Sequence, residues 1–251
     1  MAAEVLFYCF LFLVGLVAGG VVNFCIRCLS KGEEASQGTC SEGSEEGWKR
    51  SDRISILSYL SQKGGKFPGG AQDFTQRLIV ELVNGVLYIT VFMANGFDPM
   101  SVLYCLMTSA FLVISIVDER TLEIPLPCNY FVGAVGILTC VLDFANVWEH
   151  LIGAGVIFLL LYGLYFFSKG MAIGGGDVKL MAAAGLILGG KLILIAFFLS
   201  CVIGSVCHLI RMKVAKAESV LAMGPYLCIG IWICALWGND LINWYLSFLI
   251  F

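Results

Sequence analysis

The sequence predicts an all-α polytopic membrane protein with about eight transmembrane helices and one long cytoplasmic loop. The 251 residues are 59% hydrophobic and only 13% charged, whereas a soluble domain carries roughly 25% charged residues. Segments almost free of charge, such as 6–26 and 192–210, reach the length of about 20 residues that crosses a bilayer as a helix. Lys and Arg residues gather in alternate connecting segments, which is the pattern of a multi-pass protein with a fixed orientation.

The apolar segments place the helices in order along the chain. We expect them at residues 5–26, 78–94, 100–117, 129–143, 150–168, 178–189, 191–210 and 221–237. The separation of the sixth from the seventh depends on Gly189 and Gly190. The tail from Leu241 follows Gly238-Asn239-Asp240 and is too short to span the membrane alone, so we expect it to lie at the membrane interface, held by Trp244 and Tyr245.

The distribution of positive charge sets the orientation. With this order of helices, every Lys and Arg except Lys191 falls on one side of the membrane, and the positive-inside rule makes that side cytoplasmic. The predicted organisation is a first span at 1–26, a cytoplasmic loop at 27–77 and a membrane domain at 78–251.

No basic stripe suggests a nucleic-acid partner. The eleven cysteines lie mostly in apolar runs, where they behave as small hydrophobes and not as a disulfide framework.

Two aspartates lie at the cytoplasmic membrane boundary although they are far apart in sequence. Asp118 closes the third predicted helix, and Asp177 opens the sixth. Carboxylates at the edge of the lipid are costly and are usually functional. Two carboxyl groups that face each other hold one proton between them. The ionised group then activates a water, and the protonated group donates to a substrate carbonyl, which is the chemistry of peptide hydrolysis. The pair titrates as a unit, so neither role is assigned to one residue.

The glycines from Gly174 to Gly176 precede Asp177 directly. Glycine lets another backbone approach closely, and irregular backbone at this depth must be buried or line a wet cavity. These glycines therefore suit a site that admits an extended peptide. The simpler interpretation, a glycine turn followed by a solvated carboxylate, stays open on this segment alone.

Both segments resemble the motifs of the type IV prepilin peptidases. Asp118-Glu-Arg-Thr121-Leu-Glu-Ile-Pro125 is similar to the first aspartate motif of that family, and Gly174-Gly-Gly176-Asp177-Val-Lys179-Leu to its Gly-x-Gly-Asp-x-Lys-Leu motif. Weaker similarities occur at Gly19–Ile26, Ile56–Gly64, Val80–Glu81 and Gly224–Leu227.

The resemblance implies a metal-independent aspartyl endopeptidase of the bacterial inner membrane with Asp118 and Asp177 as catalytic residues. Its substrates would be type IV prepilins or type II secretion pseudopilins, which it would cut on the cytoplasmic side beside their hydrophobic helix. Many members also N-methylate the product with S-adenosylmethionine, so this activity is an open expectation. Glu81 and Asn23 are the residues that the resemblance associates with substrate or methyl transfer, and an ordinary helix-boundary carboxylate and an interhelical hydrogen bond are the alternatives.

The long loop departs from the family pattern. Two Cys-x-x-Cys pairs that would bind zinc in such loops are absent, because the second pair falls at Lys66 and Gly69 and the first retains at most Cys40. A closed structural zinc site needs about four ligands. Even with Cys25 and Cys28 the count reaches three thiols, so we expect no zinc.

Two other functional classes compete with a leader peptidase. A transporter that binds protons or cations at intramembrane acids explains the helices and both aspartates, but not the attached Ile124-Pro125 and Lys179-Leu180. A protease of the presenilin or signal-peptide-peptidase type would need a Tyr before the first aspartate, where this chain has Val117. Lys179 serves either to tune Asp177 or as a positive-inside anchor. Asp143, Glu149 and Asp240 are expected to be solvated residues on the outer side.

Overall fold

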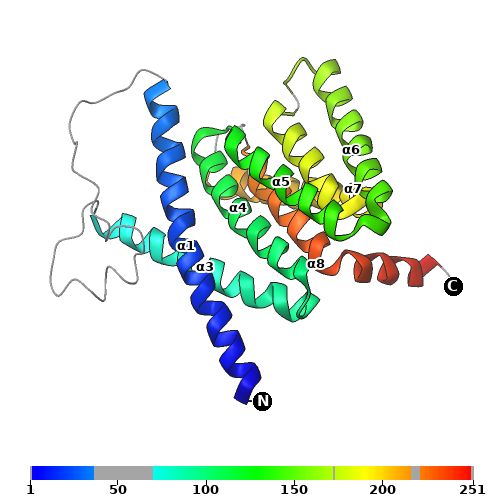
Figure 1. Cartoon of the computed structure of the whole chain (residues 1–251). Coiled ribbons are helices and arrows are strands. Elements are labelled where there is room, and N and C mark those ends of the chain that lie inside the picture. The colour runs from blue at the N-terminus through cyan, green and yellow to red at the C-terminus, as the bar shows by residue number, and fades with distance from the viewer. Residues whose placement is uncertain (1, 37–69, 172, 216–220, 250–251) are drawn as a thin grey trace. The chain divides into compact units, whose positions relative to one another are not determined.

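The described chain is helical throughout its regular structure. A computed structural model describes residues 2–36, 70–171, 173–215 and 221–249. Its elements are α1 (Ala2–Ser36), α3 (Gly70–Asn95), α4 (Pro99–Thr121), α5 (Leu126–Leu142), the short 3-10 helix η2 (Phe144–Asn146), α6 (Val147–Phe167), α7 (Gly175–Ala215) and α8 (Gly224–Leu249) (Figure 1). No strand occurs in these ranges, and the predicted all-α class is confirmed.

Six of the described helices are long and apolar enough to cross a membrane. Their apolar parts are Glu4–Ser30, Thr75–Asn95, Pro99–Thr121, Phe144–Phe167, Gly175–Val214 and Gly224–Ser247, and the shorter apolar helix Leu126–Leu142 accompanies them. The chain is therefore a multi-pass membrane protein, although the predicted number of eight spans is not established by these helices. Helix α1 continues beyond the predicted end of the first span, and α3 begins before the predicted end of the loop. Most of the expected loop, including Cys40, Lys66 and Gly69, lies outside the described residues.

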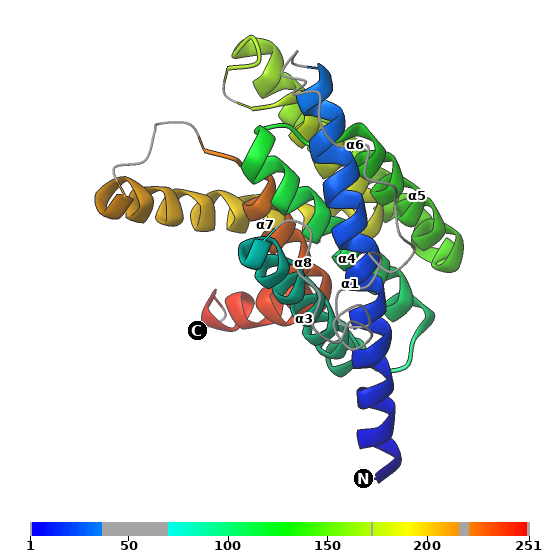
Figure 2. The same cartoon turned by 90° about the vertical axis from the view of Figure 1, so that its left-hand side faces the viewer.

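The chain divides into two compact units, Met1–Met93 and Ala94–Phe251. In the first unit α1 and α3 pack closely enough to exclude side chains at their contact (Figure 2). A Cβ atom on Gly15 would lie 2.6 Å from Cα of Gly85. The Asn84 amide also donates to the Gly15 carbonyl at 2.8 Å. Close approach through small residues and interhelical hydrogen bonds are the forces that join helices in lipid, where the hydrophobic effect between them is absent.

The second unit contains α4 to α8. Helix α4 begins where Asp98 accepts a hydrogen bond from the Met100 N–H at 3.1 Å, and Pro99 follows this N-cap residue. It runs beside α8 in the opposite direction: the Trp232 indole N–H donates to Thr108 Oγ1 at 3.1 Å, while residue 118 meets residue 224. As a result the end of α4 adjoins the beginning of α8.

Helix α7 is broken at Gly189, whose φ of 76° and ψ of 175° are not helical. This backbone conformation is essentially restricted to glycine. The predicted break between 178–189 and 191–210 is therefore confirmed. The tail from Leu241 is helical and forms the end of α8, which continues through Gly238 to Leu249, and its position at the membrane interface stays a prediction. Gly238 packs against the Leu192 side chain, and a larger residue there would collide with it.

The break in α7 is covered by α6 at Gly153. A Cβ atom on Gly153 would lie 2.5 Å from the Gly189 carbonyl carbon and 2.7 Å from the Gly190 nitrogen. These are backbone atoms, so they cannot move aside as a flexible side chain would. The close contact fixes where the first half of α7 ends. It therefore also fixes the position of the residues at the N-terminus of α7.

We predict that Gly153→Ala destabilises the protein by about 1–3 kcal/mol, because overpacking forces α6 away from α7. Thermal unfolding in detergent measures this effect. Gly155→Ala is the matched control on the same helix, since its added Cβ would meet nothing within 4 Å. Equal stability of the two variants would show that α6 and α7 are not in contact through Gly153.

Candidate active site

Asp118 is a buried carboxylate in the last turn of α4. Its residue is 4% exposed, and its Oδ2 accepts a hydrogen bond from the Gly224 N–H at 2.8 Å. Gly224 is the first residue of α8. The first N–H groups of a helix have no partner within the helix, so α8 supplies a donor that a carboxylate requires when it leaves water.

No residue larger than glycine fits at position 224 in this arrangement. A Cβ atom there would lie 2.6 Å from Asp118 Oδ2 and 2.8 Å from its Cγ. A side chain would therefore push the carboxyl group away from the N–H that binds it. The first aspartate is positioned by a backbone group, which no side-chain pattern in its own motif reveals.

Asp177 lies in the first turn of α7 and is partly exposed. Its Oδ2 accepts a hydrogen bond from the Gly174 N–H at 3.2 Å, and the Val178 N–H bonds to the Gly174 carbonyl at 3.3 Å. The glycine segment thus folds back over the start of the helix and holds the carboxyl group, as N-terminal capping interactions do. Of these glycines, Gly174 and Gly175 are exposed to solvent.

The beginning of α5 holds the glycine segment from the other side. A Cβ atom on Gly176 would lie 3.0 Å from Ile124 Cβ, so the two residues are in close contact. Asn129, in the first turns of α5, donates from Nδ2 to the Gly176 carbonyl at 3.3 Å. Pro125 lies between Ile124 and Asn129 in sequence, is buried, and is the N-cap residue of α5. The Ile-Pro pair therefore connects the first aspartate's helix to the backbone beside the second.

The two aspartates converge at one end of the second unit, where α4 ends and α7 begins (Figure 1). Their carboxyl groups interact electrostatically. The Cys228 thiol on α8 is 3% exposed and lies within electrostatic range of both carboxyl groups. This arrangement joins a buried carboxyl group and a partly exposed one.

The geometry agrees with comparisons to known proteins. The profile of the type IV leader peptidase family matches residues 105–209, which include both aspartates. The prepilin leader peptidase/N-methyltransferase of Xanthomonas campestris pv. campestris is 30% identical over 208 residues, which are 78% of this chain and 71% of that protein. The chain belongs to the type IV leader peptidase family.

Other members of the leader peptidase family show the same similarity. The prepilin leader peptidase/N-methyltransferase of Stutzerimonas stutzeri is 29% identical over 210 residues, covering 78% of this chain and 71% of its own. That of Bacillus subtilis (strain 168) is 26% identical over 198 residues, covering 77% of this chain and 79% of its own. No solved structure matches the chain. The predicted family resemblance is confirmed.

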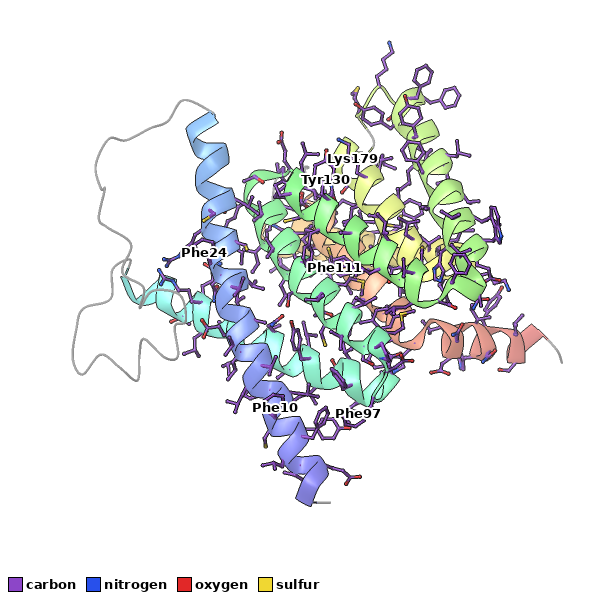
Figure 3. All side chains as sticks on the ribbon, in the orientation of Figure 1. Phe10, Phe24, Phe97, Phe111, Tyr130 and Lys179 are labelled. Atoms are coloured by element: carbon purple, nitrogen blue, oxygen red, sulfur yellow. The ribbon has the colours of Figure 1, made fainter. Side chains whose placement is uncertain are left out.

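The remaining leader peptidase motif residues have different surroundings. Thr121 closes the end of α4: its Oγ1 donates to the Val117 carbonyl at 3.0 Å and is also 3.2 Å from the Glu123 carbonyl. Lys179 is exposed at the same end of the unit as the aspartates, whereas Phe111 lies deeper in α4 (Figure 3). Thr121 thus shapes the turn into Ile124 and Pro125, and Lys179 lies on the surface.

Glu81 and Asn23 belong to the first unit. Glu81 is fully buried and Asn23 is 9% exposed. The Asn23 amide donates to Glu81 Oε1 at 3.3 Å and to the Arg77 carbonyl at 3.0 Å. The interhelical hydrogen bond expected as one alternative for Asn23 is therefore present. The structure does not place these two residues relative to the aspartates.

Metal ligands do not cluster in the described part of the leader peptidase. Within those ranges no group of three or more His, Cys, Asp or Glu side chains is placed to hold a metal ion. Cys25 and Cys28 lie on α1 as free thiols. Because Cys40 falls outside the described residues, the expectation that the loop holds no zinc stays a prediction.

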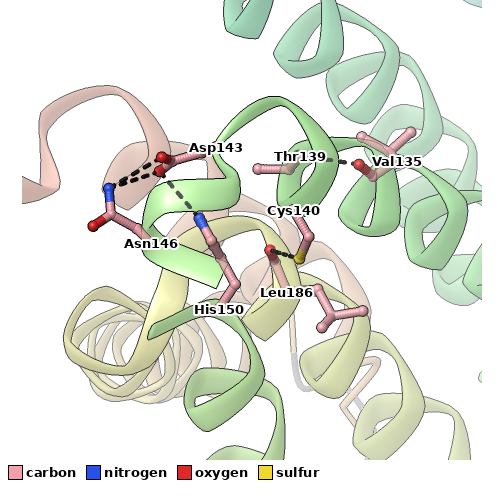
Figure 4. A network of polar contacts seen from close by, with 7 residues as sticks. All are labelled: Val135, Thr139, Cys140, Asp143, Asn146, His150 and Leu186. Carbon is pink, nitrogen blue, oxygen red and sulfur yellow. Dashed lines mark hydrogen bonds and ion pairs between the residues drawn. The ribbon is translucent and has the colours of Figure 1, made fainter. Parts of the chain in front are cut away.

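A second polar cluster lies between α5 and α6, at the end of α5 remote from Pro125 (Figure 4). Asn146 Nδ2 lies 3.0 and 3.1 Å from the two carboxyl oxygens of Asp143, and His150 Nε2 lies 3.3 Å from Oδ2. The hydrogen bond from Asn146, followed by the contact with His150, lowers the pKa of Asp143 below its ordinary value of 3.8, against the opposing effect of burial. Asp143 is partly exposed, as expected for a residue at a helix boundary, and it has these two partners in addition.

The pH dependence of protein stability tests the pairing of Asp143 with Asn146 and His150 without an activity assay. A carboxyl group with a lowered pKa in the folded protein stabilises it above the unfolded pKa, and this contribution is lost as the pH falls through the folded pKa. We predict that Asp143→Asn lowers the melting temperature by on the order of 1–2 °C at pH 6, because the group is near the surface. The difference should shrink as the pH falls below the ordinary value of 3.8 and through the lower pKa of Asp143 in the folded protein. Asp240→Asn, at an exposed position of α8, controls for loss of one charge, and a difference that grows toward low pH would contradict the assignment.

Proposed function

We propose that this protein is an aspartyl endopeptidase that removes the N-terminal leader of type IV prepilins or type II pseudopilins at the cytoplasmic face of the bacterial inner membrane. The supporting observation is the convergence of Asp118 and Asp177. They come from helices far apart in sequence, interact electrostatically and are each held by a glycine N–H. Family membership and the names of the relatives support the substrate class.

In the proposed reaction the two carboxyl groups share one proton and bind a water between them. The ionised carboxylate removes a proton from the water, whose oxygen attacks the carbonyl carbon of the scissile peptide bond. The protonated carboxyl group donates its proton to the carbonyl oxygen, which gives a tetrahedral diol. As the diol collapses and the C–N bond breaks, one carboxyl group gives the leaving amine the proton that it took from the water, and the other removes a proton from a diol hydroxyl group, so the pair returns to its singly protonated state.

The surroundings of the aspartates suit this reaction in two respects. Gly224 and Gly174 each bind one carboxyl oxygen, Oδ2, through backbone N–H groups. Backbone donors of this kind hold a reacting group with little freedom to reorganise. The partly exposed Asp177 and the exposed Gly174 and Gly175 leave one side open to water and to an extended substrate. The alternative of an ion-coupled transporter has no such use for a glycine segment beside the carboxyl group.

The described residues do not fit a bound S-adenosylmethionine. Glu81 and Asn23 are the residues that the family resemblance associates with methyl transfer. They are closed to solvent and bonded to each other, whereas a cofactor of that size needs an open pocket with accessible polar groups. We therefore derive no step through this cofactor and propose peptidase activity alone for the described residues.

Replacement of either aspartate tests the proposed pair. We predict that Asp118→Asn and Asp177→Asn each lower leader cleavage by roughly 10²–10⁴-fold or more, because a general acid–base group is lost. The assay is co-expression with a prepilin in a host without its own leader peptidase, followed by mass spectrometry of the new N-terminus, which reports cleavage and methylation together. Asp143→Asn, at the remote end of α5, should cleave normally. Cleavage by either active-site variant at the wild-type rate, with equal protein abundance, would exclude the aspartyl mechanism.

Gly224→Ala tests the positioning of Asp118 without removing a carboxyl group. The added Cβ would displace Asp118 from the Gly224 N–H, and a misplacement of about 1 Å in a catalytic group costs on the order of 10²-fold. We predict a loss of that size in kcat, measured with purified enzyme and a prepilin peptide. Gly163→Ala, whose Cβ would meet nothing within 4 Å, should leave kcat unchanged. A Gly224→Ala enzyme with the wild-type kcat would mean that α8 does not position Asp118.

A further inference from the structure

Asn129 carries a buried acceptor that the described structure leaves unused. Its residue is 5% exposed, and its Oδ1 atom is buried without a hydrogen-bond partner. Its Nδ2 atom donates to the Gly176 carbonyl, which can only accept. This bond fixes which way the amide is turned, so the unpaired oxygen cannot be exchanged with the nitrogen by a flip of the group. Buried amide oxygens in proteins almost always have a partner, and an exception calls for an explanation.

The position of Asn129 connects it to the reacting groups. Gly176 is bonded directly to Asp177, so the Asn129 amide lies one peptide unit from the backbone of the second aspartate. The preceding residue, Cys128, lies within electrostatic range of Cys228, which in turn lies within range of both aspartates. The first turns of α5 therefore border the carboxyl pair, and a group bound at Asn129 Oδ1 would lie beside it.

The chemistry of the atom restricts what it can bind. An amide oxygen only accepts hydrogen bonds, so its partner must bring an N–H or O–H group. The substrate of an endopeptidase brings a series of backbone N–H groups on either side of the scissile bond. A peptide held in extended form next to Gly176 would present such a group at the right depth, because the neighbouring glycines have no side chains to keep another backbone away.

We propose that Asn129 positions the substrate: Nδ2 holds the Gly176 carbonyl beside Asp177, and Oδ1 accepts a hydrogen bond from a substrate backbone N–H close to the scissile bond. This inference rests on the proposed peptidase function. It assigns to α5 a direct part in recognition, in addition to its packing against the glycine segment.

The experiment combines a variant with a change in the substrate backbone. Asn129→Leu keeps the approximate volume and removes both the donor and the acceptor. The substrates are synthetic peptides that span the leader–helix junction, together with a series in which one peptide N–H at a time is replaced by an ester oxygen. We expect one ester near the cut to lower kcat/KM of the wild-type enzyme by about 10-fold, the size of one hydrogen bond. With Asn129→Leu the amide peptide should lose at least about 10-fold, and the same ester should cause no further loss.

The control variant is Thr139→Val, also on α5. Thr139 is 1% exposed, and its hydroxyl donates to the Val135 carbonyl of its own helix. The Thr139→Val enzyme should show the same loss of kcat/KM with each ester substrate as the wild type. This control separates the loss of a buried polar group from the loss of a substrate contact.

The results distinguish this inference from the function on which it rests. Ester penalties that are the same in the wild type and in Asn129→Leu at every position would overturn it, as would an Asn129→Leu enzyme with wild-type kcat/KM. The first result would leave Asn129 as a residue that only holds Gly176. Failure of the wild type to cleave any amide peptide, or cleavage that survives Asp118→Asn, would instead refute the proposed function.

Discussion

The hydrogen bond from the Gly224 N–H to Asp118 is the contact on which the arrangement of this site depends. Asp118 is 4% exposed, so its carboxyl group needs a hydrogen-bond donor from the protein. The first N–H groups of a helix have no partner within the helix, so the start of α8 can supply this donor without an additional loop. The bond joins the end of α4 to the beginning of α8 over 106 residues of sequence. The two helices pack antiparallel, as the Trp232–Thr108 bond also shows. This packing places the Gly224 N–H beside the Asp118 carboxyl group.

The second aspartate is positioned by different means. Gly153 of α6 lies against the broken backbone at Gly189 and sets where the first half of α7 ends. At its other end, Ile124 and Asn129 of α5 contact Gly176, and the Gly174 N–H binds Asp177. Both carboxyl groups are thus bound by main-chain donors of glycine residues. A larger residue at Gly224 would keep its N–H donor but would displace the carboxyl group that the donor binds.

Hydropathy and charge were sufficient to predict the helices and to place both aspartates at their ends, because lipid imposes a length and an end on every apolar segment. The break at Gly189 was also predictable from two adjacent glycines. Asn129 and Cys228 were not, since each lies in an apolar run where a polar or thiol group carries no pattern of its own. Asn129 is linked to the site by its bond to Gly176, 47 residues away, and Cys228 by its electrostatic interaction with carboxyl groups on other helices. The pairing of Asp143 with His150 was missed for a similar reason, because a carboxyl group at a helix end resembles a solvated boundary residue.

Helix α7 has irregular backbone at both ends of its first half, and the surroundings of these two places differ. The break at Gly189 is buried against Glu149 and Gly153 of α6, as irregular backbone at membrane depth requires. The segment before Asp177 differs: Gly174 and Gly175 are exposed, and the carboxyl group beside them is partly exposed. Backbone groups there can exchange water for the N–H and carbonyl groups of an incoming strand without breaking the bundle. Glycine therefore has two different surroundings in α7. Gly189 is covered by another helix, whereas Gly174 and Gly175 are exposed, and Asp177 follows the exposed glycines in sequence.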